Sequence, residues 1–116
     1  MYYISKEIEI DAAHKLNLSY DSKCNSCHGH RWSIVIHCKA ITLNADGMIV
    51  DFAHIKKNIV DQLDHSYLND KFAEWNTSAE NLSRWLTTQI PHCYKAEVWE
   101  TPGSYACYEN DEFVAR

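Results

Sequence analysis

Apolar and polar side chains alternate along the first part of the chain. One parity holds Ile4, Ile8, Ile10 and Ala12, and the other holds Glu7, Glu9 and Asp11. Because successive side chains of a strand point to opposite faces, this alternation predicts a half-buried strand over residues 2–12. The apolar parity continues to His14, so we expect this histidine at the end of the strand, on its apolar side.

Four further strands are predicted by the same reasoning. A second long strand covers residues 31–43, and a short strand follows the turn sequence of residues 44–47, over residues 48–50. Near the end of the chain, residues 94–101 and 104–109 flank Pro102-Gly103, which predicts a hairpin.

Two helices are predicted between these strands. Apolar residues recur at helical spacing after Asp51, a good N-cap, up to about Asp64. A second helix begins near Ser78, where Thr77 and Glu80 have the spacing of a capping box, and ends before Pro91. We prefer this capping role of Glu80 to a role as a ligand. The order of elements predicts an α+β domain, with an antiparallel sheet and both helices on one face.

Composition narrows the possible functions. A chain of 116 residues forms one domain with an ordinary core, here residues 1–116. Acidic residues outnumber basic ones by 16 to 11, and no basic stripe suits nucleic acid. No apolar run is long enough for a membrane span and no signal-peptide pattern is present, so we expect a soluble, cytoplasmic protein. The five cysteines are odd in number and have no secretory context, which indicates reduced thiols rather than disulfides.

Candidate chemistry concentrates in residues 24–30, Cys-Asn-Ser-Cys-His-Gly-His. If the chain is extended here, His28 and His30 project together on the apolar face. Two neighbouring imidazoles suit Zn2+, which takes three protein ligands in a typical catalytic site. His14 supplies the third ligand if the first two strands pair. The alternative is that His14 is an ordinary histidine at a strand end.

Two other positions carry candidate functional groups. Glu100 ends an apolar row of the strand over residues 94–101, and a buried carboxylate needs a partner. That partner is either a structural lysine or arginine, or a ligand that presents N–H groups. Asp64 and His65 are adjacent, which suits acid–base chemistry but is also common at a solvated helix end.

Several motifs together resemble one protein family. They are His14, Cys24-x-x-x-His-Gly-His30, Asp51-Phe52, Leu63-Asp-His-Ser-Tyr-Leu-Asn69, Ser78-Ala-Glu-Asn81 and Val98-Trp-Glu-Thr-Pro102. In this order they resemble the 6-pyruvoyltetrahydropterin synthase family, and most of all its 6-carboxytetrahydropterin synthase branch. The resemblance extends from Ile8 to about Glu109.

The resemblance implies a role for each matching residue. The zinc histidines of the family fall on His14, His28 and His30, its catalytic cysteine on Cys24, its Asp-His pair on Asp64 and His65, and its pterin-binding carboxylate on Glu100. Ser78 is the candidate hydroxyl near the pterin. The implied fold is the tunnelling fold, with a four-stranded antiparallel sheet and two helices from each subunit assembled into a barrel. The implied assembly is a homohexamer with active sites between subunits.

The resemblance also implies a reaction. The enzyme would be a zinc-dependent lyase that converts 7,8-dihydroneopterin triphosphate to 6-carboxy-5,6,7,8-tetrahydropterin, acetaldehyde and triphosphate, on the route to 7-deazaguanine compounds such as queuosine. The cationic residues Lys15, Lys23 and Arg31 are close in sequence to the candidate site residues, so we expect them near the triphosphate.

Two alternatives remain at this point. One is a closed structural zinc module of Cys24, Cys27, His28 and His30, although four ligands within seven residues strain the chain. The other is a sibling activity, such as that of a 6-pyruvoyltetrahydropterin synthase. Cys27 and Thr77 depart from the usual family pattern, the first by creating a Cys-x-x-Cys and the second by standing where proline is common.

Overall fold

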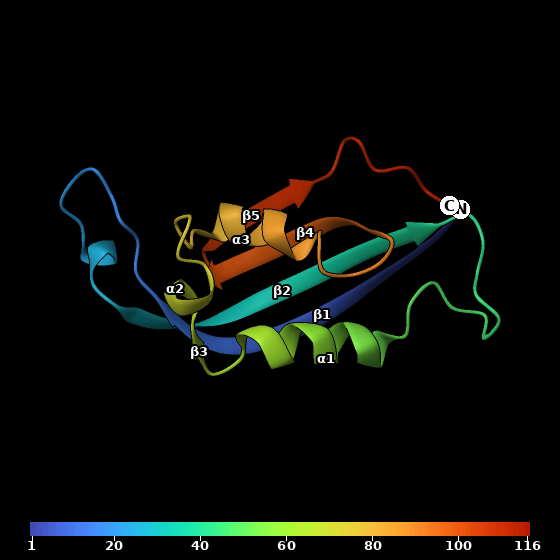
Figure 1. Ribbon diagram of the computed structural model, residues 1–116, viewed down its shortest axis with the longest axis horizontal. Helices are drawn as coiled ribbons and strands as arrows, with labels where there is room; N and C mark the ends of the chain where they lie inside the picture. Colours follow the sequence, from blue (N-terminus) through green and yellow to red (C-terminus); the bar gives the residue numbers. More distant parts are fainter.

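The computed structural model describes residues 1–116 and is built on one five-stranded sheet (Figure 1). The strands are β1 (Tyr2–His14), β2 (His28–Ala40), β3 (Ser66–Tyr67), β4 (Cys93–Thr101) and β5 (Ser104–Glu109). Their order across the sheet is β3-β1-β2-β4-β5, antiparallel except for β3, which runs parallel to β1. The four long strands are those predicted. The expectation of a four-stranded, purely antiparallel sheet is corrected by β3, which makes the sheet mixed.

Three helices lie on one face of this sheet: α1 (Phe52–Leu63), α2 (Leu68–Lys71) and α3 (Ala79–Leu86). Helix α1 packs on β1, whereas α3 packs on β4 and β5. Between helices and strands lies a single core of 22 buried apolar residues. Each fully buried large aliphatic side chain contributes about 1.5–3 kcal/mol by leaving water, so this core stabilises the domain without disulfides. No helix has the length and apolar character needed to cross a membrane.

The helix starts show which sequence signals the fold uses. Asp51 is the N-cap of α1, as predicted, and accepts a hydrogen bond from the N–H of Ala53 at 2.8 Å. The N-cap of α3 is Ser78, whose Oγ accepts from the N–H of Asn81, so the predicted capping box of Thr77 and Glu80 is wrong. Helix α3 ends at Leu86, and turns continue the chain towards Pro91.

The predicted short strand over residues 48–50 is also wrong. The side-chain oxygen of Asn44 accepts hydrogen bonds from the N–H groups of Asp46 and Met48, and the N–H of Asn44 donates to the Met48 carbonyl. These bonds close a turn, and the backbone of residues 48–50 pairs with no strand of the sheet. Ile49 instead inserts into the core.

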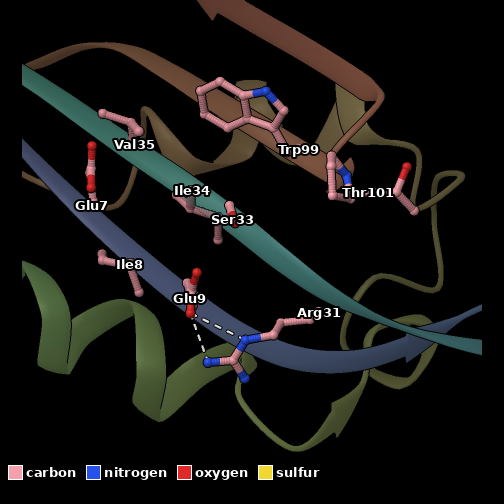
Figure 2. Close-up of a pocket in the computed structure, with 10 residues that line it drawn as sticks. Glu7, Ile8, Glu9, Arg31, Ser33, Ile34, Val35, Trp99 and Thr101 are labelled. Carbon is pink, nitrogen blue, oxygen red and sulfur yellow. Dashed lines mark hydrogen bonds and ion pairs between the residues drawn. The ribbon is translucent and has the colours of Figure 1, made fainter.

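The face of the sheet away from the helices carries a groove of about 510 Å³ across β1, β2 and β4 (Figure 2). Arg31 lies in this groove, with Nη2 at 2.7 Å from Glu9 Oε2 and Nη1 at 3.3 Å from Asp11 Oδ1. Hydrogen bonds and charge from Glu9, then from Asp11, raise the pKa of the Arg31 guanidinium. Because alternate residues of a strand face opposite ways, Arg31 points away from the side that carries His30.

Candidate functional site

Three histidines meet where β1 ends and β2 begins. In the antiparallel pairing His14 stands opposite His28, and His30 follows two residues along β2. The ring centroids of His14 and His28 are 4.6 Å apart, those of His28 and His30 are 4.7 Å apart, and those of His14 and His30 are 5.3 Å apart. The register therefore brings the three predicted histidines into one cluster.

Backbone carbonyls determine which ring nitrogens face the centre of this cluster. His14 is fully buried, and its Nδ1 lies 2.7 Å from the carbonyl oxygen of Thr77. A carbonyl only accepts, so Nδ1 carries the hydrogen and Nε2 presents a lone pair. The Nδ1 atom of His28 donates in the same way to the Ser26 carbonyl at 2.7 Å. Burial is the main cause that lowers the pKa of His14, because the imidazolium loses its hydration; the ring is therefore neutral.

The cluster fits a bound zinc ion by its donor atoms. The Nε2 atoms of His14 and His30 are buried without a hydrogen-bond partner. Leaving a buried polar atom unpaired costs about 1–3 kcal/mol, so two such atoms side by side are suited to bind a ligand. Ligand atoms from the three histidines and Glu100 all lie within 4.8 Å of one another. Neutral imidazoles with one carboxylate suit zinc better than magnesium or calcium, which prefer oxygen ligands.

Glu100 reaches this cluster from β4. It follows the buried Ala96 and Val98 on the same face, and its Oε1 lies 2.8 Å from His30 Nε2 and 3.8 Å from His14 Nε2. Although His30 Nε2 lies this close to the carboxylate, the two atoms do not form a hydrogen bond, and His30 Nε2 has no hydrogen-bond partner. The neighbours of the carboxylate are thus imidazoles, and neither a lysine nor an arginine pairs with it.

Trp32 forms the inner wall of the cluster. Its side chain is fully buried, and its indole N–H donates to the Ala12 carbonyl at 3.2 Å. The ring centroid is 4.9 Å from that of His14 and 5.5 Å from that of His30. The indole therefore keeps water from the core side of the histidines.

Asp64 and His65 form a second constellation at the end of α1. Asp64 Oδ2 lies 3.0 Å from His65 Nδ1, and Asp64 Oδ1 accepts a hydrogen bond from the Asp11 N–H at 2.9 Å. The bond from Asp11 is the main cause that lowers the pKa of Asp64. His65 adopts a left-handed backbone (φ 55°), and its N–H donates to the Asp11 carbonyl. Its imidazole is 79% exposed, and no hydrogen bond or ion pair joins the pair to the histidine cluster.

Cys24 occupies a third place, in the 3-10 turn Lys23–Asn25. Its N–H donates to Ser22 Oγ at 3.2 Å, and its carbonyl accepts from the Leu16 N–H at 2.7 Å. The thiol is partly exposed and makes no hydrogen bond, and all five cysteines are free. Ser78 uses its Oγ as the N-cap of α3, so its hydroxyl hydrogen remains available to a ligand.

Sequence reasoning missed three residues that support these groups. Asp11 holds both Asp64 and His65 through its backbone, whereas Thr77 and Asn69 lie behind His14. The one available signal is Thr77, which the resemblance to the family marks as a departure from its usual pattern. Asp11 makes its contacts through its backbone, which almost any residue type could do, so the sequence does not predict them.

Comparison with known proteins finds similarity over nearly the whole chain. The family model described as 6-pyruvoyl tetrahydropterin synthase matches residues 3–111. A relative from Synechocystis sp., named 6-carboxy-5,6,7,8-tetrahydropterin synthase, is 31% identical over 121 residues, which covers 93% of this chain and 93% of the relative. A protein of the same name from Haemophilus influenzae is 26% identical over 94% of this chain and 99% of its own length.

The fold has solved counterparts as well. The structure of Caenorhabditis elegans 6-pyruvoyl tetrahydropterin synthase superposes with a TM-score of 0.75 at 23% identity, over 95% of this chain and 96% of that one. At this identity the likeness concerns the fold alone. The match of the family model to nearly the whole sequence goes further: the chain belongs to the 6-pyruvoyl tetrahydropterin synthase family.

Proposed function

We propose that this chain is a zinc-dependent lyase that converts 7,8-dihydroneopterin triphosphate and water to 6-carboxy-5,6,7,8-tetrahydropterin, acetaldehyde and triphosphate. The observation that carries the proposal is the cluster of three histidines beside Glu100, in which the Nε2 atoms of His14 and His30 are buried and unpaired. That the chain is an enzyme of the 6-carboxytetrahydropterin synthase type follows from its family and its relatives. We place the reaction in the cytoplasm, on the route to 7-deazaguanine compounds such as queuosine.

His14, His28 and His30 would hold the zinc ion. When bound, zinc supplies a Lewis acid that polarises the side-chain oxygens of the substrate. The protein's contribution is to keep the His14 imidazole neutral and to aim the rings inward. The carbonyls of Thr77 and Ser26 fix two of the rings by accepting from Nδ1.

Cys24 and the Asp64–His65 pair supply the groups that move protons in this proposal. The Cys24 thiolate takes and returns a proton at the substrate side chain. Asp64 holds the Nδ1 side of His65 at 3.0 Å, which leaves His65 Nε2 free to exchange a proton with the substrate. The depressed pKa of Asp64 keeps it ionised, so it stabilises the imidazolium that forms.

Glu100 would bind the pterin. A carboxylate accepts two hydrogen bonds at once, which matches the amino group and ring N–H of a pterin, and Ser78 would add a hydroxyl nearby. The closeness of Glu100 to His30 and His14 also suits a role as a metal ligand. The substitution Glu100→Gln distinguishes the two roles, because weaker pterin binding and weaker zinc binding are separate results.

Residues that should act together share no hydrogen bond or ion pair within one chain, and this supports an assembly. Cys24 and the Asp64–His65 pair have no bond to the histidine cluster, whereas two strand edges remain open. The outer edge of β1 is covered by β3 only at Ala12 and Ala13, and β5 has no outer neighbour. Open edges pair readily with other strands. We therefore propose a homo-oligomer, a hexamer, with each active site completed between subunits.

The triphosphate requires cations on an acidic protein. Arg31 is already shared by Glu9 and Asp11 on the other side of the sheet. Lys15 and Lys23 precede Cys24 in the sequence, and we propose that they contact the triphosphate.

The test is incubation of the metal-replete protein with 7,8-dihydroneopterin triphosphate, followed by mass spectrometry of the pterins and detection of acetaldehyde. A carboxypterin with stoichiometric acetaldehyde is the expected result. A pyruvoyl product would assign the sibling activity to the same site, although the three-residue gap between Cys24 and His28 favours the carboxy branch. Absence of turnover with zinc bound would refute the proposal.

A further inference from the structure

We infer that Asn69 and Thr77 are positioning residues of the metal centre, which together hold the His14 imidazole with its Nε2 towards His28 and His30. The inference rests on the proposed function in one respect, because it takes these histidines as the metal ligands. It adds two side chains from outside the cluster that determine how tightly the metal is held.

Asn69 continues the sheet edge beside His14. The short strand β3 pairs with β1 at Ala12 and Ala13 and then ends. Beyond it, the Asn69 side chain takes the place of a strand: its Oδ1 accepts from the Lys15 N–H at 2.9 Å, and its Nδ2 donates to the Lys15 carbonyl at 2.8 Å. This amide therefore fixes the backbone of the residue that directly follows His14.

Thr77 links this backbone to the imidazole. Its carbonyl accepts from His14 Nδ1, and its fully buried hydroxyl lies 3.3 Å from both the Lys15 carbonyl and Asn69 Oδ1. A hydroxyl has one hydrogen, so it donates to one of these two oxygens at a time. His14, Lys15, Asn69 and Thr77 thus form a closed ring of bonds around the first metal ligand.

Buried polar groups are hydrogen-bonded in any well-formed core, and that alone would explain these contacts. The position of this ring of hydrogen bonds argues for a more specific role. It includes the bond to His14 Nδ1, and the other nitrogen of that imidazole, Nε2, is buried and unpaired. Groups that orient a ligating histidine in this way typically change metal affinity by about 10–100-fold when they are removed.

The experiment measures the zinc dissociation constant of the full chain by competition with a chromophoric chelator. Asn69→Ala removes both bonds to Lys15, and Thr77→Val removes the hydroxyl with little change of shape. Each should raise the dissociation constant about 10–100-fold. Thr77→Ser, which keeps a hydroxyl, should bind zinc like the parent protein. Circular dichroism verifies that each variant is folded at the temperature of the measurement.

Asn44→Ala is the matched control. Asn44 also satisfies two backbone N–H groups through its side chain, but it lies in the turn beyond the opposite end of β2. Its loss should lower stability without changing zinc affinity. Cobalt substitution adds a second measurement, because the ligand-field absorption of bound Co2+ should change in Asn69→Ala and Thr77→Val but not in Asn44→Ala.

Parental zinc affinity and cobalt spectra in folded Asn69→Ala and Thr77→Val would overturn the inference. If Asn69→Ala does not fold, the comparison of Thr77→Val with Thr77→Ser decides it alone. His14→Ala separates the two levels of the proposal. If that variant keeps full zinc affinity, the proposed metal centre is wrong; if it loses zinc while Asn69→Ala and Thr77→Val do not, only the positioning role is wrong.

Discussion

Removal of the metal should leave the domain folded but lower its melting temperature. The core of 22 buried apolar residues lies between the sheet and the helices, and it includes none of the three histidines. An ion that binds only the folded state adds a free energy of RT ln(1 + [L]/Kd). Stripping the metal removes this term and nothing else.

The size of the effect follows from the length of the chain. At free zinc about 100 times the dissociation constant, the binding term is about 2.7 kcal/mol. With an unfolding entropy of about 2.1 cal/mol/K per residue, a chain of 116 residues has about 0.24 kcal/mol/K in total. The ratio predicts a fall in melting temperature of about 11 °C.

The assay is thermal unfolding followed by circular dichroism at a series of buffered free zinc concentrations, starting from chelator-treated protein. The melting temperature should rise with the logarithm of free zinc, and this dependence should be lost in His14→Ala. Unfolding of the stripped protein at room temperature would refute the reasoning, because it would mean a structural module held together by its metal. A melting temperature independent of zinc would refute it in the opposite direction, since no ion would then bind the folded state.

Three other perturbations test individual groups. Cys24→Ala should abolish turnover while zinc content and pterin binding stay unchanged, as measured by steady-state kinetics and metal analysis; full activity would remove Cys24 from the chemistry. Glu100→Gln should raise KM for the pterin without changing zinc affinity, because an amide cannot accept both hydrogen bonds; a loss of zinc affinity instead would make Glu100 a metal ligand. Acidification should destabilise the metal-free protein below about pH 6.5, where an unfolded histidine takes up a proton. The pKa of folded His14 is lowered, so between the two pKa values the unfolded state binds more protons and stability falls as pH falls; His14→Gln should show a shallower decline in chemical denaturation.

The long strands could be predicted because one face of each is buried and the other is polar. A period of two residues excludes registers shifted by one residue, and the observed register buries Ile8, Ile10 and Trp32 on one face and sets His14 opposite His28. The pattern that predicts the strands therefore also places the three histidines on the same face, whereas their exact pairing depends on the register.

Short elements could not be predicted in this way. Strand β3 has two residues and α2 has four, which is too few for any periodicity to be read. Their place depends on tertiary contacts, among them the pairing of Asn69 with the Lys15 backbone. Thr77 and Ser78 are both plausible N-caps by residue type, and the choice between them depends on the burial of Thr77 behind His14.

The site was only partly readable for a similar reason. The parity of β4 predicts that Glu100 lies on the buried face, but its contact with His30 depends on how β2 and β4 align, and these strands are far apart in sequence. The backbone contacts of Asp11 with Asp64 and His65 carry no sequence signature. In the proposed assembly, the groups proposed to move protons meet the proposed metal centre between subunits, and the sequence of one chain carries no pattern for such an arrangement.

The position of Trp32 gives the protein an optical reporter of its own. An indole packed edge-on against two imidazoles, with its N–H held by the Ala12 carbonyl, senses any change in charge at those rings. Loading the histidines with a cation should therefore alter the emission of Trp32, which sits rigidly in the core. With the other tryptophans replaced by phenylalanine, the occupancy of the site could be followed in real time without a label.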